Sequence, residues 1–185
     1  FDAQIFTKTL TKGVEFKDLE VYHGKGNVYT KKEKQDAERL ARAFTVNQFA
    51  MNRLRNSKFE VPMCGVLEDI PFRGKADIIT DRGHIIDLKT CQNITNFKRD
   101  AYQMGYDIQT YIYSKLWDIN YKKFEFIAID KKSLDIGVYA CSKEFYESGE
   151  HKVKNVLSAY KDKIQNQSAD DVTEFINNYY FEDTL

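Results

Sequence analysis

Residues 74–90 read GKADIITDRGHIIDLKT, with apolar runs on both sides of an Asp-Arg-Gly turn. This pattern predicts a β-hairpin. Because successive side chains of a strand point to opposite faces, Asp87 and Lys89 should lie on the same face. The turn should fold the strand that carries Asp77 back beside them. We therefore expect two carboxylates and one ammonium group on a single patch of the sheet.

Such a patch has the groups that metal-assisted hydrolysis of a phosphodiester needs. The reaction requires a cation that neutralises developing charge and a water molecule whose pKa is lowered. Paired carboxylates are hard oxygen ligands that suit Mg²⁺ or Mn²⁺, and a neighbouring lysine can orient or deprotonate the water. The same residues would also fit an exposed strand with a surface ion pair. Ile85, Ile86 and Leu88 instead indicate a strand that is buried on at least one face, where unpaired charge is costly.

The elements around this hairpin follow from the spacing of apolar residues. Residues 1–29 have little periodicity and are expected to be irregular. Thr30 and Glu33 form a capping-box sequence, which predicts a helix from there to about Arg55. Three strands should follow, over residues 59–67, 70–80 and 84–90, with Glu68 and Asp69 in the first turn. After them we expect a helix, two strands and two more helices, over residues 97–118, 124–130, 134–141, 143–165 and 169–180.

This order predicts a single α/β domain over residues 1–185. Its sheet should be mixed, because a crossover helix makes one neighbouring strand pair parallel. The chain does not begin with methionine, as expected for a fragment of a longer protein. No apolar run reaches the roughly 20 residues that span a bilayer, and the first residues do not resemble a signal peptide. We therefore expect a cytoplasmic protein without a membrane partner.

Composition and cysteine content narrow the class of protein further. Hydrophobic residues make up 42% of the chain and charged residues 30%, which is typical of a folded domain rather than a disordered one. The three cysteines, Cys64, Cys91 and Cys141, are far apart in the sequence. They suit unpaired thiols in a reducing cytoplasm and are too few for a four-cysteine zinc or iron–sulfur site.

The net charge is zero, but the charges are unevenly distributed. Residues 8–58 carry a local charge of +6, and the tail from Ser168 carries −5. Phosphate binding depends on this local field more than on the total. We therefore expect the basic half to face nucleic acid through four arginines of the first helix, namely Arg39, Arg42, Arg53 and Arg55. The alternative is a solvated surface on which these arginines pair with Glu33, Asp36 and Glu38.

The arrangement GKAD-x9-DLKT, followed by QTYIY in an aromatic helix, resembles the RecB/RecE branch of the PD-(D/E)xK nucleases. Within that branch it is most similar to the RecE-type (exonuclease VIII) phage recombination exonucleases. The similarity includes TKKEKQDAERLARAF before the hairpin and FKRDAYQMGYDIQTYIY after it, and so covers about residues 30–140. The resemblance implies an α/β restriction-endonuclease-like fold, in which helices flank a central mixed sheet.

The resemblance also implies a role for each residue of the patch. Asp77 and Asp87 would bind the metal, with the Leu88 carbonyl as a further ligand, and Lys89 would assist the water. An acid on the first hairpin strand would be Glu60. Glu68, at the turn, is the alternative, and either could equally be an ordinary exposed carboxylate.

The Q-x3-Y motif of that family falls on Gln109 and Tyr113, which would contact the metal site or the DNA backbone. Without the resemblance, both would be taken as core or surface residues. Neighbouring aromatic and basic residues could stack on bases or grip phosphates, or could simply form the core; these are Tyr102, Tyr106, Lys98 and Arg99. We expect Asp100 and Asp107 to be solvated. Family members often carry a catalytic histidine on an upstream helix, and none of His23, His84 and His151 matches it.

The function that the resemblance implies is a Mg²⁺-dependent deoxyribonuclease. It would act as a 5′–3′ exonuclease on duplex DNA ends, in phage-type recombination inside a bacterial host cell. A single-strand annealing protein and further copies of the chain are expected partners. Two alternatives remain open: a structure-specific or restriction-type endonuclease on the same fold, and a catalytically inactive domain that binds DNA or protein.

Overall fold

A mixed five-stranded sheet forms the centre of the molecule. The structure, a computed structural model, describes residues 5–6, 13–24 and 26–178. The strands run in the order β3-β4-β5-β6-β7, and their bounds are Lys58–Leu67, Ile70–Ile79, Ile85–Cys91, Phe124–Asp130 and Ile136–Ala140. β5 and β6 are parallel, and the other neighbouring pairs are antiparallel. The predicted strands and the predicted mixed sheet are confirmed.

The β3–β4 hairpin is long and closes through a two-residue turn. Glu68 and Asp69 both have positive φ, 49° and 63°, as the tight turns that match strand twist require. One face of the hairpin packs against helix α5 (Tyr106–Leu116): a Cβ added to Gly74 would meet the Tyr113 ring at 3.1 Å. The opposite face of the hairpin is exposed, as the alternating burial along β3 and β4 shows.

The ladder between β4 and β5 is short. The Asp-Arg-Gly turn forms as predicted, with Gly83 at φ 71°. Two residue pairs join the described strands, Ile78 with Ile86 and Ile79 with Ile85. On its other edge, β5 pairs in parallel with β6 along its whole length, from Ile85 to Cys91. The ladder between β4 and β5 therefore ends next to Asp77 of β4 and Asp87 of β5.

Helices α4 (Phe97–Gln103) and α5 connect β5 to β6, and the long helix α6 (Lys143–Tyr160) packs on α5. The prediction of one helix over 97–118 is wrong. Gly105 adopts the left-handed conformation at φ 70°, which ends α4 and starts α5 in a new direction. Short 3₁₀ turns, η1 (Ile94–Asn96) and η2 (Tyr121–Lys123), lie on either side of this helix pair.

Aromatic residues fill the space between the sheet and these helices. Phe124 and Phe126 of β6 are 0% and 2% exposed and contact each other at 5.2 Å between ring centroids. Phe97 of α4 and Phe145 of α6 pack on Phe126. Burial of each such ring stabilises the fold by about 1.5–3 kcal/mol. On the other face of the sheet, Leu54, Ile78, Ile86 and Ile127 form a smaller core.

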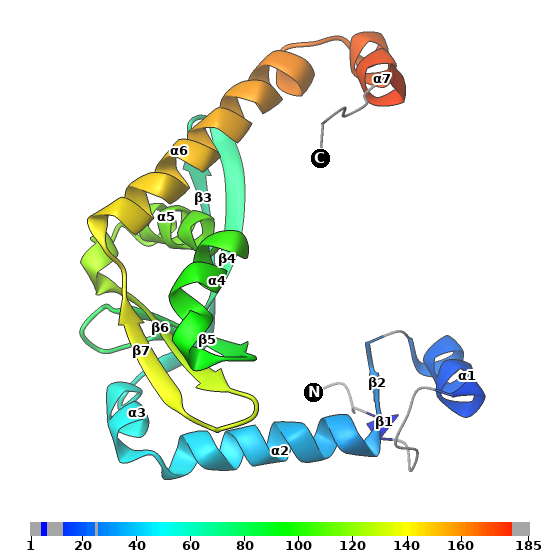
Figure 1. Cartoon of the computed structure of the whole chain (residues 1–185). Coiled ribbons are helices and arrows are strands. Elements are labelled where there is room, and N and C mark those ends of the chain that lie inside the picture. Colours follow the sequence, from blue (N-terminus) through cyan, green and yellow to red (C-terminus); the bar gives the residue numbers. More distant parts are fainter. Residues whose placement is uncertain (1–4, 7–12, 25, 179–185) are drawn as a thin grey trace.

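The N-terminal region is more regular than expected. Helix α1 (Val14–His23) and a parallel pair of short strands, β1 (Ile5–Phe6) and β2 (Val28–Tyr29), replace the predicted irregular lead-in. Phe16 and Val28, 1% and 3% exposed, give this part its own small core. Figure 1 shows it at the far end of α2, away from the central sheet.

The predicted capping box at Thr30 and Glu33 is present at the start of α2 (Lys31–Val46). The predicted continuous helix to Arg55 is wrong, because Asn47 ends α2 and caps α3 (Gln48–Arg53) by accepting a hydrogen bond from the Ala50 amide at 2.9 Å. At the other end of the chain, α6 runs into a π-helical turn, η3 (Lys161–Gln165), and then α7 (Ala169–Asn178). In Figure 1, α2 and the α6–α7 arm extend from opposite ends of the sheet. Among the described helices, none is both long and apolar enough to cross a membrane.

Candidate active site

Asp87 is the buried centre of the site. Its side chain is 2% exposed, because β5 lies inside the sheet between β4 and β6. Gln109 donates a hydrogen bond from Nε2 to Asp87 Oδ1 at 2.6 Å. The Lys89 ammonium lies 2.5 Å from Asp87 Oδ2. The predicted placement of Asp87 and Lys89 on one face of the strand is thus present.

Gln109 bridges the acid and the lysine. While its amide nitrogen donates to Asp87, its Oε1 accepts a hydrogen bond from Lys89 Nζ at 3.1 Å. Lys89 also lies 4.6 Å from the centre of the Tyr106 ring, a cation–π contact. One glutamine of α5 therefore fixes the relative positions of two charged groups of β5.

Asp77 lies at the point where β4 and β5 separate. Its Oδ2 accepts a hydrogen bond from the Leu88 amide at 3.0 Å, in place of a backbone partner. The N–H and C=O groups of one residue point to the same edge of a strand, so the Leu88 carbonyl faces the same gap. The structure thus brings together Asp77, Asp87, Lys89 and the Leu88 backbone. The sequence pattern predicted that the first three converge, and the family resemblance implied the Leu88 carbonyl.

Burial and the Lys89 charge act on the Asp87 carboxyl in opposite directions. Burial raises the pKa of Asp87 above its ordinary value, and the Asp77 charge adds to this, while Lys89 and Gln109 oppose it. Asp87 Oδ2 is shielded from solvent, and the Lys89 ammonium is its charged partner at 2.5 Å. A cation near both carboxylates would favour the ionised form of Asp87.

The donor set fits a hard divalent cation. Mg²⁺ is commonly held by one or two carboxylates together with water molecules and substrate phosphates. Asp77, Asp87 and the Leu88 carbonyl supply such a set. Over residues 5–6, 13–24 and 26–178, no three His, Cys, Asp or Glu side chains gather closely enough to hold a metal by themselves.

Glu60, the expected acid of the first strand, lies beside the site and forms an ion pair with Lys75. The register that pairs Phe59 with Ile78 and Val61 with Ala76 leaves Glu60 opposite Asp77. Glu60 has a φ of 53°, a conformation that costs energy for a side chain with a Cβ and that clusters at functional sites. The alternative, Glu68, is wrong: its turn closes the far end of the hairpin.

The two residues of the Q-x3-Y motif, Gln109 and Tyr113, make different contacts. Gln109 contacts both charged residues of β5, whereas the Tyr113 hydroxyl donates to the Lys75 carbonyl at 3.0 Å and so holds β4. Tyr106 stacks on Phe126, with 5.5 Å between ring centroids, and belongs largely to the core. Tyr102 is 42% exposed and rests against Phe145.

Among the acids of these helices, Asp100 is partly exposed and pairs with Arg99 at 2.9 Å. The expectation that Asp107 is solvated is wrong. It is 0% exposed and lies in the contact between α5 and α6. Its sequence neighbours gave no sign of this, because the burial comes from a helix that starts 36 residues later.

Some arginines of the basic N-terminal half form contacts within the protein. Arg53 pairs with Glu125 at 2.7 Å and lies 4.9 Å over the Phe49 ring, and Arg39 bonds the Lys131 carbonyl and pairs with Asp36. Lys8, Lys12 and Lys25, and Glu182 and Asp183 of the acidic tail, lie outside the described residues.

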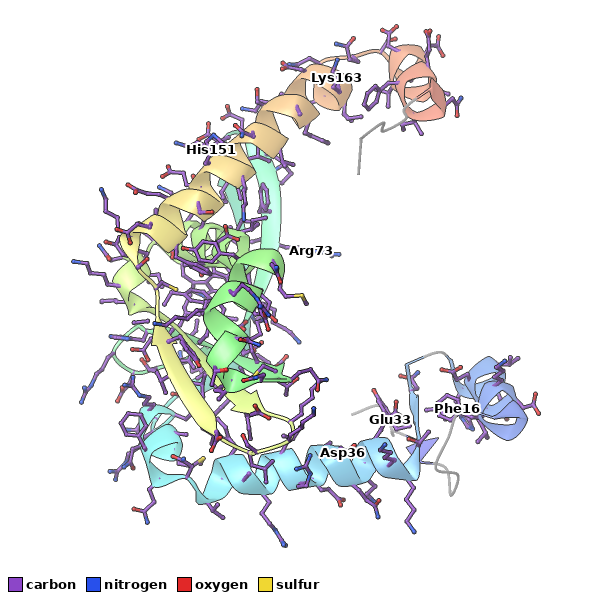
Figure 2. All side chains as sticks on the ribbon, in the orientation of Figure 1. Phe16, Glu33, Asp36, Arg73, His151 and Lys163 are labelled. Atoms are coloured by element: carbon purple, nitrogen blue, oxygen red, sulfur yellow. The ribbon has the colours of Figure 1, made fainter. Side chains whose placement is uncertain are left out.

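Two basic residues beside the site were not singled out from the sequence. Arg73 and Lys75 alternate with Gly74, which faces α5, and so lie on the exposed face of β4. Figure 2 shows the Arg73 side chain extending from β4 away from α5 and α6. The Glu60 carboxylate, and more weakly Asp77, raise the pKa of Lys75 and so favour its charged form. The alternation Arg73-Gly-Lys75-Ala-Asp77 was the signal that could have identified them.

Comparisons with known proteins bear on the fold. The sequence profile of the family described as "PDDEXK-like domain of unknown function (DUF3799)" matches residues 4–179. A crystal structure of a candidate exonuclease from Eubacterium rectale aligns over 92% of this chain and 70% of its own, with a TM-score of 0.63 and 19% identity. The structure of SSO0001 aligns over 77% of this chain and 67% of its own, with 14% identity and a TM-score of 0.39, too low to support an argument. No curated protein matches the sequence.

Proposed function

The chain belongs to the DUF3799 family of PDDEXK-like domains, and on that basis we propose that it is a divalent-metal-dependent nuclease. The observation that supports this most is the contact of Asp87, Lys89 and Gln109 beside Asp77, at the gap between β4 and β5. The expected PD-(D/E)xK fold is confirmed by the family match and the structural similarity. The narrower RecE-type assignment is part of the proposal.

Asp77, Asp87 and the Leu88 carbonyl would hold Mg²⁺ or Mn²⁺. Such a cation neutralises charge on a bound phosphate and lowers the pKa of a water molecule. Lys89, held 3.1 Å from Gln109 Oε1, presents its ammonium to the same space and would orient the attacking water or stabilise charge on the phosphate. Gln109 keeps this ammonium and the Asp87 carboxylate in a fixed geometry, which lowers the cost of orienting the reacting groups.

We further propose that the substrate is DNA and that cleavage proceeds from duplex ends in the 5′–3′ direction. The resemblance to RecE-type exonucleases supports this, as does the similarity to a structure described as a candidate exonuclease. Arg73 and Lys75 on the exposed face of β4 would guide the phosphate backbone towards Asp77. Resection for recombination, with a single-strand annealing protein and further copies of the chain as partners, would be the biological role.

One experiment separates this proposal from its alternatives. Linear duplex DNA and covalently closed circular DNA are incubated with the protein in Mg²⁺, Mn²⁺ or EDTA, with Asp87→Asn in parallel. We expect metal-dependent shortening of the linear DNA from its 5′ ends and no cutting of the circle. Cutting of the circle by the wild type alone would indicate an endonuclease. Binding without any cutting would indicate an inactive domain and contradict the proposal.

A further inference from the structure

A buried ion pair joins α5 to α6 behind the candidate active site. Asp107, in the first turn of α5, is 0% exposed. Its Oδ2 lies 2.6 Å from the Lys152 ammonium and accepts a hydrogen bond from Ser148 Oγ at 2.7 Å. Lys152 is 40% exposed, so its charge remains near solvent while that of Asp107 does not. The buried carboxylate therefore depends on these two side chains of α6.

The backbones of the two helices also meet at this point. A Cβ added to Gly149 would lie 2.0 Å from the Asp107 carbonyl oxygen. No larger residue fits there without moving one of the helices. Gly149 lies between Ser148 and Lys152 in sequence, so the close approach and the ion pair act on the same turn of α6. Together they fix the position of the first turn of α5.

That turn leads directly to Gln109. An α-helix rotates about 100° per residue, so Asp107 and Gln109 point to nearly opposite sides of α5. Asp107 faces α6, and Gln109 faces β5, where it bonds Asp87 and Lys89. The backbone N–H of Gln109 closes the first turn by donating a hydrogen bond to the Gly105 carbonyl at 3.3 Å. On its N-terminal side the turn connects to α4 through Gly105, a left-handed break that does not by itself hold α5 in place.

We infer that Lys152 is a positioning residue for the candidate active site: it holds Asp107, and through the first turn of α5 sets the placement of Gln109 between Asp87 and Lys89. This inference rests on the proposed nuclease function for its kinetic consequence, but not for its structural one. A displacement of about 1 Å in a catalytic constellation can lower a rate by about a hundredfold. Gln109 touches the two charged residues with bonds of 2.6 and 3.1 Å, so it has little room to move.

The first test reads the placement of Gln109 without any activity. The side-chain amide signals of Gln109 are assigned in ¹H–¹⁵N spectra by their loss in Gln109→Ala. In Lys152→Met they should shift away from their wild-type positions. In Lys154→Met, which removes an exposed ion pair with Glu150 on the same helix, they should stay. Lys152→Arg, which keeps the charge, should restore the wild-type positions.

Lys152→Met leaves a buried charge without its partner and could prevent folding. Asp107→Asn is the second variant, for the case in which Lys152→Met does not fold. It removes the buried charge but keeps the side-chain volume and the Ser148 contact, and Lys152 stays near solvent. The Gln109 signals should shift in the same direction in this variant. Unchanged Gln109 signals in folded Lys152→Met or Asp107→Asn would overturn the inference.

The second test uses cleavage of linear DNA, with all variants at a temperature where circular dichroism shows them folded. Lys152→Met should lose about 10- to 100-fold in rate in the wild-type background. In the Gln109→Ala background the same change should cost less than about twofold, because the route through Gln109 is already lost. Equal losses in both backgrounds would overturn the inference and leave a purely structural role. A wild type that does not cut DNA would refute the proposed function, while the Gln109 signals still decide the placement.

Discussion

The Asp77 carboxylate accepts the Leu88 amide hydrogen bond at 3.0 Å, beyond the last residue pair of the β4–β5 ladder. A side chain thus provides the link that the backbone of β4 does not. The same carboxylate is a proposed metal ligand, so Asp77 joins the two strands and also carries charge into the gap between them. These two roles can be separated by substitution.

Asp77→Asn should abolish most cleavage while leaving the fold nearly as stable as the wild type. Asparagine keeps an oxygen that can accept the Leu88 bond but loses the charge, and loss of one electrostatic contact costs about 10²–10³-fold in rate. Asp77→Ala should lose the same activity and about 1 kcal/mol of stability as well. Cleavage rates in Mg²⁺ and thermal melts would check both; equal melting of the two variants would contradict the bridging role.

Asp87→Asn should inactivate the protein and stabilise it in EDTA at neutral pH. Burial raises the pKa of Asp87, so the folded state binds this proton more tightly than the unfolded state does. Such a group adds to the free energy of unfolding below the pKa that it has in the unfolded chain. This contribution is lost as the pH rises through the pKa that the group has in the folded protein. The variant should therefore gain stability at neutral pH and none at acidic pH. Melts in EDTA across this range would test it, and a loss of stability at neutral pH would be the contrary result.

Lys89→Arg should retain DNA binding and lose most cleavage. Arginine keeps the positive charge, but its planar guanidinium cannot occupy the compact position between Asp87 Oδ2 and Gln109 Oε1. Binding would be measured by fluorescence anisotropy and cleavage on the same linear duplex. If binding and cleavage fell together, Lys89 would be a phosphate anchor rather than a group that acts on the water.

Arg73→Gln should weaken DNA binding and lower the salt dependence of log K by about one unit, without changing sequence preference. The reason is its place on the exposed face of β4, two residues before Lys75. Lys143→Gln, an exposed basic residue that pairs with Glu147 on α6, is the matched control and should change neither quantity. Identical salt dependence of log K for wild type and Arg73→Gln would show that DNA binds to another face of the protein.

Arg53→Gln should destabilise the protein rather than act on DNA alone. Arg53 pairs at 2.7 Å with Glu125, a largely buried carboxylate, and its loss leaves that charge without a partner. We expect a loss of about 1–3 kcal/mol, measured by chemical denaturation. Arg55→Gln is the neighbouring control and should leave stability unchanged. The expectation of phosphate contacts by Arg39, Arg42, Arg53 and Arg55 stays a prediction, with Arg53 and Arg39 also engaged in contacts within the protein.

The strands and the patch were predictable because they depend on local rules. A two-residue period and a tight turn determine that Asp87 and Lys89 share a face and that Asp77 returns beside them. The helix ends depend on single residues whose effect is ambiguous in sequence. Gly105 lies within an apolar helical pattern, and the pattern alone does not show that it is left-handed.

Contacts between distant elements were not predictable from these rules. Asp107 is buried where Gly149 lets α6 approach α5, and Arg53 of α3 meets Glu125 of β6, 72 residues later in the chain. Glu60 pairs with Lys75 and has a positive φ of 53°, and neither feature follows from the local sequence pattern. The sequence thus indicated which candidate groups lie together, but not which residues of other elements hold them in place.

The short β4–β5 ladder divides the sheet into two hydrogen-bonding units, with the candidate metal ligands on their seam. The β3–β4 hairpin has its own long ladder and β5–β7 have theirs, so the two units can open with separate free energies. Amide protons of the hairpin should then exchange with deuterium at a different rate from those of β5 and β6. A cation that binds on both sides of the seam would slow exchange across it and couple the two units into one.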